Sequence, residues 1–159
     1  QKDQIEDIVK WLCESRYVRI TVVIANKRLY NGPYFDPHGD RPFDPIRFRS
    51  FFTKILLERH FATEGIMTQE CDLIFDRAIG ESEEGNLRQY LRGNFALPPF
   101  SNILQCDSRY IPALQFADVV VHIVKEYVFG QRESVDGRML RCVNVFDMTD
   151  PRKIVELSL

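Results

Sequence analysis

The sequence predicts an α/β domain built around a mostly parallel sheet. Segments rich in β-branched residues alternate with segments whose apolar residues recur at helical spacing, which is typical of parallel strands joined by right-handed crossover helices. In addition, segment 17–27 (YVRITVVIANK) is apolar on both faces around residues 21–25, as expected for a central strand covered on both sides. We therefore expect a single α/β domain over residues 1–159.

Size and composition agree with this class. Of the 159 residues, 45% are hydrophobic and 28% are charged, and a chain of this length buries about two-thirds of its unfolded surface. The 21 basic and 23 acidic residues give a net charge of −2, so no chain-wide positive field marks a nucleic-acid-binding protein, although a local basic strip is compatible with that total. No apolar run is long enough to span a membrane.

The cysteines indicate the compartment. Cys13, Cys71, Cys106 and Cys142 are dispersed and form no C-x-x-C pair. This spacing predicts reduced, buried thiols rather than a disulfide framework or a zinc site, and the first residues do not resemble a secretory signal peptide. We therefore expect a cytoplasmic protein.

The first half of the chain predicts two helices around the central strand. Residues 4–15 have the apolar spacing of a short amphipathic helix. Residues 31–45 contain prolines and glycines at turn positions and predict a long irregular loop, of the kind that often forms a functional flap. Asp44 and Pro45 then suit the N-cap and first position of a second helix. Its inner side is expected to carry Phe48, Phe51, Phe52, Ile55 and Leu56.

The second half continues the alternation. A short strand at 71–76 (CDLIFD) is followed by a connection (GESEEGN) and a helix at 86–95 that turns Leu87, Tyr90 and Leu91 inward. A third strand at 101–107 (SNILQCD) precedes a helix over 112–129. After Gly130, the pattern predicts a strand at 139–146 and a short helix that begins after Asp150 and Pro151.

Polar residues mark the ends of the predicted strands. Asn26, Asp76 and Asp107 lie at the carboxyl ends, where ligands bind in parallel α/β sheets. On a helical wheel, the polar residues of the helix at 112–129 fall within an arc of about 100°, and apolar residues occupy nearly all the rest. These polar residues are Gln115, Asp118, His122, Lys125 and Glu126.

Two interpretations of this polar stripe remain open. The stripe either contacts water, with Asp118 and His122 as an i, i+4 pair, or faces the strand ends, so that Asp118 meets Asp76 and Asp107. Three clustered carboxylates require a cation, and a site made of oxygen ligands favours Mg²⁺ or Mn²⁺. Such a site would polarise a phosphodiester and activate water.

Three segments carry a resemblance to a known family. IFDRA (74–78), NLRQYL (86–91) and CDSRYIPALQFAD (106–118) resemble the matching motifs of the domain-of-unknown-function 3800 family, over about residues 17–130. The resemblance implies a ribonuclease-H-like mixed sheet with helices on both faces and a metal-dependent nuclease that hydrolyses phosphodiester bonds in nucleic acid. It also implies that Asp76, Asp107 and Asp118 are catalytic metal ligands, that Gln115 orients a ligand or water, and that Lys27 contacts phosphate.

Other features widen the range of functions. Arg88, which follows the polar connection on the third helix, is a candidate phosphate contact beside Lys27 and Gln115. Asn26 stands where family members often have aspartate, and the family's acidic first hairpin either precedes Gln1 in a longer chain or is lost. The alternative function is therefore a catalytically inactive ribonuclease-H-like binding or scaffold module of a larger protein. A third possibility is a fragment that binds nucleic acid without cutting it.

Overall fold

The computed structural model of the chain describes residues 7–8, 10–11, 14–36, 38–39, 42–65, 71–76, 81–95, 100–130 and 140–158. The chain divides into two compact units, each with its own hydrophobic cluster. One unit comprises Gln1–Asn31 and Phe116–Leu159, and the other comprises Gly32–Gln115. The helix that contains Gln115 and Phe116 begins in the second unit and continues into the first.

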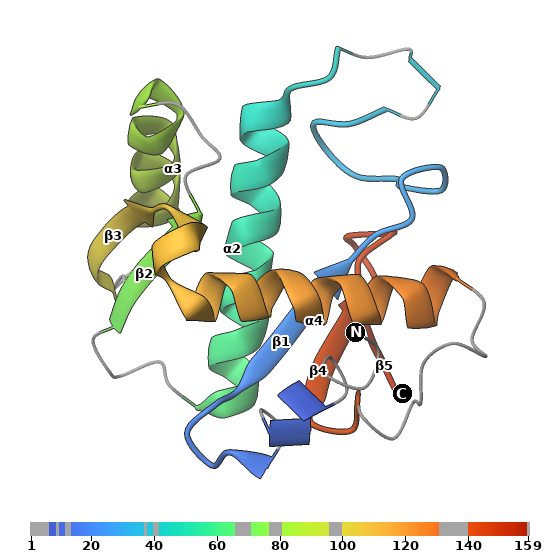
Figure 1. The fold of residues 1–159 in the computed structure, drawn as a ribbon. Helices are drawn as coiled ribbons and strands as arrows, with labels where there is room; N and C mark the ends of the chain where they lie inside the picture. The colour runs from blue at the N-terminus through green and yellow to red at the C-terminus, as the bar shows by residue number, and fades with distance from the viewer. Residues whose placement is uncertain are drawn as a thin grey trace. The chain divides into compact units, whose positions relative to one another are not determined.

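The described residues form an α/β structure, which confirms the predicted class (Figure 1). Its elements in chain order are β1 (Ile20–Ile24), α2 (Pro45–Glu64), β2 (Cys71–Asp76), α3 (Glu81–Asn94), β3 (Phe100–Cys106), the 3₁₀ turn η1 (Ser108–Tyr110), α4 (Pro112–Phe129), β4 (Val143–Asp147) and β5 (Val155–Leu157). The described strands pair in two sheets, in the orders β1-β4-β5 and β2-β3. The pairs β1–β4 and β2–β3 are parallel, and β5 runs antiparallel to β4. The ribonuclease-H-like arrangement of a single sheet stays a prediction.

In the Gln1–Asn31 and Phe116–Leu159 unit, β1 and β4 supply alternate residues to the core. Val22 of β1 and Val145 of β4 are register partners, and both are buried. Val120 and Val124 of α4 pack in the same cluster. Burying each such aliphatic side chain stabilises the fold by about 1.5–3 kcal/mol, an upper estimate for a partly compact unfolded chain. Among the described strands, β4 is the middle strand and β1 lies at the edge of this sheet, so the prediction that segment 17–27 forms a central strand is wrong for the described sheet.

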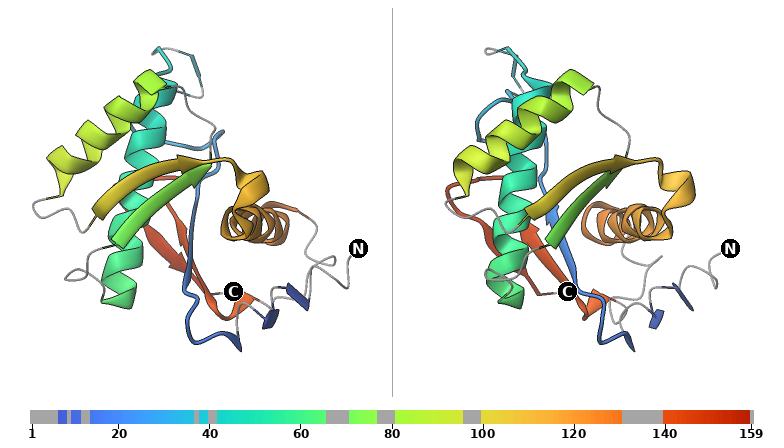
Figure 2. Two further views of the ribbon diagram at one scale, coloured as in Figure 1. Left: turned by 60° about the vertical axis from the view of Figure 1, so that its left-hand side comes forward. Right: turned by 90° about the vertical axis from the view of Figure 1, so that its left-hand side faces the viewer.

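In the Gly32–Gln115 unit, α2 and α3 pack against the β2–β3 pair, whose strands lie side by side in Figure 2. Phe61 of α2, Leu91 of α3 and Ile103 of β3 belong to one buried cluster. On the opposite face of this pair, Ile74 and Leu104 are 41% and 43% exposed. Among the described residues of this unit, the helices therefore cover one face of the sheet, and the arrangement with helices on both faces stays a prediction.

The ends of α2 follow the predicted local signals. The Asp44 carboxylate accepts a hydrogen bond from the backbone N–H of Arg47 at 3.0 Å, and Pro45 occupies the first turn. The helix ends at Gly65, whose φ of 67° is left-handed and whose N–H donates to the carbonyl of Phe61. The predicted helix start is thus confirmed.

The apolar side of α2 differs from the wheel prediction. Leu57 and Phe61 are buried in the cluster with α3, whereas the predicted Leu56 is only half-buried. The phenylalanines of the first turns face the preceding loop instead, since the ring of Phe48 lies 5.5 Å from that of Phe35 and 4.5 Å from that of Phe52. The proline-rich loop is therefore irregular, as predicted, and anchored to α2 by aromatic contacts.

Three predicted boundaries change. The segment read as a connection is helical from Glu81, because acidic residues favour a first helical turn and the buried Leu87 and Leu91 anchor the next turns. After Asp150 the chain makes a turn, with the Asp150 carboxylate accepting the N–H of Arg152, and then enters β5 instead of a helix. The strand predicted at 139–146 begins at Val143. Of the helix predicted at 4–15, residues 7–8, 10–11 and 14–15 are described, and all of them except Ser15 are helical.

The structure also bears on the predictions about membrane-spanning segments and cysteines. No helix in the described part of the chain is both long and apolar enough to cross a membrane. Cys71 and Cys106 are free thiols, as predicted, but are half-buried rather than buried, whereas Cys142 takes part in a disulfide bond. The prediction of reduced thiols is therefore wrong for Cys142, and the cysteines no longer argue for a cytoplasmic protein.

Candidate functional site

Two of the predicted aspartates share one edge of the β2–β3 pair. Asp76 is the last residue of β2 and lies opposite Cys106, the last residue of β3, so Asp107 follows at the same edge. The backbone N–H of Ser108 donates to Asp76 Oδ1 at 3.1 Å. The parallel register thus brings Asp76 to the Asp107-Ser108 motif from 32 residues away in sequence.

Asp107 is neutralised by a neighbouring arginine. Its carboxylate caps η1 by accepting the backbone N–H of Arg109 at 2.9 Å. The Arg109 Nε also donates to both carboxylate oxygens at 3.0 Å, and Nη2 donates to Oδ2 at 2.5 Å. These bonds raise the pKa of Arg109, and desolvation opposes the increase. The sequence interpretation missed Arg109, although an acid and an arginine two residues apart in a turn could have indicated the pair.

Gln115 fixes the start of α4 against the same turn. Its Nε2 donates to the carbonyl oxygen of Ser108 at 2.9 Å. The side chain is exposed, and no described residue bonds its amide oxygen, which therefore remains able to accept from water or a ligand. Gln115 is thus hydrogen-bonded to the turn that follows Asp107, and its role in orienting a ligand or water stays a prediction.

Asp118 lies on an exposed face of α4, together with His122 and Lys125. This face is broader than the predicted stripe, because Val121 and Phe129 are also exposed, at 51% and 47%. No ion pair joins Asp118 to His122 within the described part of the chain, so the predicted i, i+4 pair does not form. Asp118 follows Gln115 by three residues, and the two side chains therefore lie on one face of the helix.

Arg88, a predicted phosphate contact, is engaged in packing within its own unit. Its Nε donates to Glu84 Oε1 at 2.8 Å, and its Nη2 donates to the carbonyl oxygen of Ile103. Gln105 of β3 in turn donates to Glu84 Oε2 at 2.8 Å. Arg88 and Glu84 thus connect α3 to β3, and the phosphate contact of Arg88 stays a prediction.

A second polar edge forms where β1 and β4 end. The backbone N–H of Asn26 donates to Thr149 Oγ1 at 2.9 Å, and Asn26 Oδ1 accepts from the N–H of Arg28 at 3.0 Å. The neighbouring Lys27 is exposed. Asp147, which pairs in register with Ile24, accepts from the N–H and hydroxyl of Thr149 at 2.8 and 2.7 Å. The sequence interpretation missed Asp147 because it ended that strand at Phe146; the rule that identified Asp76 and Asp107 applies to it equally.

These placements bring Asp76 and Asp107 to one edge, and Asn26, Lys27 and Asp147 to another. Within each unit, the described residues form no group of three or more His, Cys, Asp or Glu that could hold a metal ion. The donor chemistry at the β2–β3 edge nevertheless suits a hard cation, since both predicted ligands present carboxylate oxygens and one already binds a guanidinium.

Comparisons with known proteins do not assign a family. No protein-family model matches the chain, and no curated protein or solved structure matches it. The resemblance to the domain-of-unknown-function 3800 family therefore stays a prediction carried by the motifs around Asp76, Asp107 and Asp118.

Proposed function

We propose that the protein is a divalent-metal-dependent nuclease that hydrolyses phosphodiester bonds in nucleic acid. The observation that carries the proposal is the hydrogen bond from Ser108 N–H to Asp76, which joins two acidic strand ends at the edge where parallel sheets bind ligands. Carboxylate oxygens are the ligands that Mg²⁺ and Mn²⁺ prefer.

In this proposal Asp76, Asp107 and Asp118 hold the ion. Such an ion lowers the pKa of bound water and stabilises charge on phosphoryl oxygens. Two features support the inclusion of Asp118: its carboxylate is exposed, and it lies one turn after Gln115, which is hydrogen-bonded to the residue next to Asp107.

Arg109 and Lys27 supply positive charge to the substrate. The Arg109 guanidinium is 79% exposed and can leave Asp107 when a divalent cation takes its place. A guanidinium released beside the scissile bond forms paired hydrogen bonds with phosphate, which an arginine does better than a lysine. The exposed Lys27 offers a point charge to a substrate phosphate.

Nuclease assays with Asp118→Asn test the proposal. The variant keeps the size of the side chain but removes its charge, and we expect it to lose Mn²⁺-dependent cleavage of nucleic acid while keeping the wild-type melting temperature. Asp72→Asn is the matched control, because Asp72 is exposed at the opposite end of β2, where it accepts from Asn102 Nδ2 at 2.9 Å. Cleavage by Asp118→Asn at the wild-type rate would contradict the proposal.

A specific observation favours a second function, that of a binding or scaffold module without catalysis. Asp107 is bound through both oxygens by Arg109, and Asn26 uses its side chain in the turn after β1 rather than presenting a charge. A module of this kind would bind nucleic acid in EDTA with an affinity that depends steeply on salt concentration. It would not cleave the bound strand when Mn²⁺ is added.

A further inference from the structure

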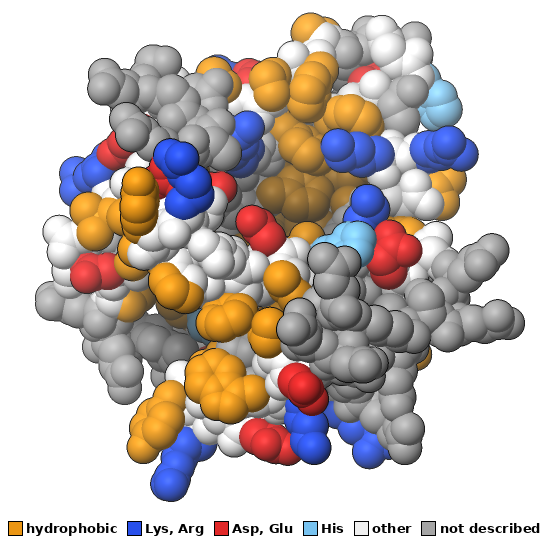
Figure 3. Space-filling model, viewed as in Figure 1, with side chains coloured by type: hydrophobic (Ala, Val, Ile, Leu, Met, Phe, Trp, Pro, Cys, Tyr) orange, Lys and Arg blue, Asp and Glu red, His pale blue; other side chains and the backbone are white. Residues whose placement is uncertain are grey.

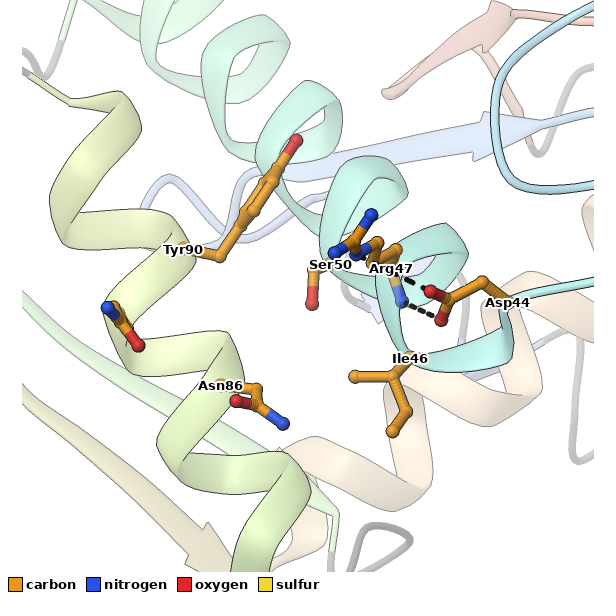
Figure 4. A pocket seen from close by; sticks show the side chains of 7 residues that line it. Asp44, Ile46, Arg47, Ser50, Asn86 and Tyr90 are labelled. Carbon is orange, nitrogen blue, oxygen red and sulfur yellow. Dashed lines mark hydrogen bonds and ion pairs between the residues drawn. The ribbon is translucent and has the colours of Figure 1, made fainter.

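The Gly32–Gln115 unit contains a cavity between α2 and α3, separate from the acidic edge of the β2–β3 pair (Figure 4). Its volume is about 390 Å³, within the range of about 300–1,000 Å³ that is common for small-molecule sites. The α2 wall is formed by Ile46, Arg47 and Ser50, with the N-cap Asp44 at the helix end. The α3 wall is formed by Asn86, Gln89 and Tyr90.

Ser50 gives the α2 wall of the cavity a hydrogen-bonding group. Only 4% of this residue is exposed, and its hydroxyl points into the space between the two helices (Figure 4). Among the described residues, no group donates to or accepts from that hydroxyl. No fully buried polar side-chain atom lacks a partner in the described part of the chain, so water reaches this hydroxyl through the cavity, and a ligand atom placed there would take the place of that water.

The α3 wall adds hydrogen-bonding groups that are also without partners in the described part of the chain. Asn86 and Gln89 are exposed and lie three residues apart on the helix. Each carries a primary amide with one acceptor and two donors, the combination that pairs with the edge of a nucleobase.

Two apolar surfaces, the Ile46 side chain and the Tyr90 ring, also line the cavity. Ile46 of α2 extends toward the α3 wall near Asn86, and the half-buried ring of Tyr90 is directed toward α2 (Figure 4). An aliphatic side chain and an aromatic ring are the surfaces on which a single unstacked base packs. Burial, together with nearby Tyr34 and Glu58, raises the pKa of Tyr90, so the phenol remains a hydrogen-bond donor at neutral pH.

Arg47 places a positive charge at the mouth of the cavity. Its side chain is 70% exposed and contacts Asp44 only through Nε, 3.4 Å from Oδ2. The terminal guanidinium nitrogens have no other partner among the described residues and can bind a phosphate.

We propose that this cavity binds one nucleotide unit, with the base between Ile46 and Tyr90 and the phosphate on Arg47. Ser50, Asn86 and Gln89 bond the base edge. The choice of a nucleotide over other flat polar ligands rests on the proposed nuclease function, and the nucleotide is either free or part of a single strand.

The test is an NMR and calorimetric titration in EDTA with 5′-AMP, adenosine, ribose 5-phosphate and a short oligoadenylate. We expect the amide signals of α2 and α3 around the cavity to shift, and Ser50→Ala and Asn86→Ala each to weaken 5′-AMP binding by about tenfold. Arg47→Ala should weaken 5′-AMP but leave adenosine unchanged. Arg92→Ala, an exposed arginine on α3 outside the cavity, is the control and should bind as wild type does.

Each outcome of the titration supports or contradicts the proposal. Ser50→Ala should keep the wild-type melting temperature or raise it, so a loss of affinity is not explained by unfolding. Binding of oligoadenylate alone assigns the cavity to a strand, and binding of 5′-AMP assigns it to free nucleotides as well. Equal binding of ribose 5-phosphate, unchanged affinity in Ser50→Ala and Asn86→Ala, or no shifts at about 1 mM ligand would overturn the proposal. Because EDTA removes divalent ions, this result does not depend on whether the protein cleaves nucleic acid.

Discussion

Asp76 and Asp107 share one sheet edge but differ in their contacts. Asp76 accepts the N–H of Ser108, whereas both oxygens of Asp107 are bound by Arg109. An ion pair whose arginine is 79% exposed contributes little to stability, because water screens it. Arg109 is therefore well placed to exchange with another cation at little cost to the fold.

Replacement of Arg109 by alanine should strengthen Mn²⁺ binding. The substitution removes the cation that competes for Asp107, and we expect the affinity measured by calorimetry to rise by at least about threefold. Arg152→Ala is the control, because Arg152 makes the same i, i+2 pair with Asp150 elsewhere in the chain. An unchanged or weaker affinity in Arg109→Ala would show that Asp107 does not bind the ion.

The cysteines should differ in their reactivity. Burial and, secondarily, the charge of Asp72 raise the pKa of Cys71, so less thiolate is present at neutral pH and iodoacetamide should react more slowly than with a model thiol. The rate should rise as the pH increases toward the raised pKa, and Asp72→Asn should increase it at neutral pH. Cys142 should label only after reduction. Mass spectrometry of the labelled peptides measures the labelling rate of Cys71, the effect of Asp72→Asn on that rate and the labelling of Cys142. Rapid labelling of Cys142 without reductant would contradict the disulfide.

Sequence reasoning located single residues well where the signal was local. The ends of two strands identified Asp76 and Asp107 because an acid directly follows or closes an apolar run. The role of Arg88 could not be predicted in this way, because its partner Ile103 lies 15 residues further along the chain. Such a contact depends on strand pairing, which periodicity does not specify.

At the scale of elements, helices with clear end signals were predicted best. The starts of α2 and α4 follow from Asp44, Pro45 and Pro112, each of which acts within one turn. The start of α3 was placed too late because Gly85 resembles part of a loop, although a glycine within a helix costs only about 1 kcal/mol. The strand β5 was missed because three residues carry too little periodicity, and its formation depends on pairing with β4.

Two glycines allow a matched test of backbone conformation. Gly65 ends α2 with a φ of 67°, and an added Cβ would meet nothing within 4 Å, so Gly65→Ala should lose about 1 kcal/mol of stability through backbone strain alone. Gly85 lies inside α3 with the same open surroundings, and Gly85→Ala should gain about 0.5–1 kcal/mol. Urea unfolding measures both values. A destabilising Gly85→Ala would show that residues 81–86 are not helical, as the sequence interpretation held.

At the scale of the whole molecule, the α/β class was predictable but the pairing of strands was not. Composition and alternation specify the class, whereas the two sheets arise from contacts between distant segments such as β1 and β4. Charge of both signs appears on the described surface drawn in Figure 3, in line with the net charge of −2. Binding of nucleic acid therefore has to rely on local groups such as Arg47, Arg109 and Lys27.

The central claim is that three aspartates from separate parts of the sequence bind one divalent ion. Calorimetric titration of Mn²⁺ into the wild type, Asp76→Asn, Asp118→Asn and Asp72→Asn tests it without any assumption about the substrate. We predict one saturable site in the wild type and in Asp72→Asn, and its loss in both Asp76→Asn and Asp118→Asn. Wild-type Mn²⁺ affinity in Asp118→Asn would contradict the claim.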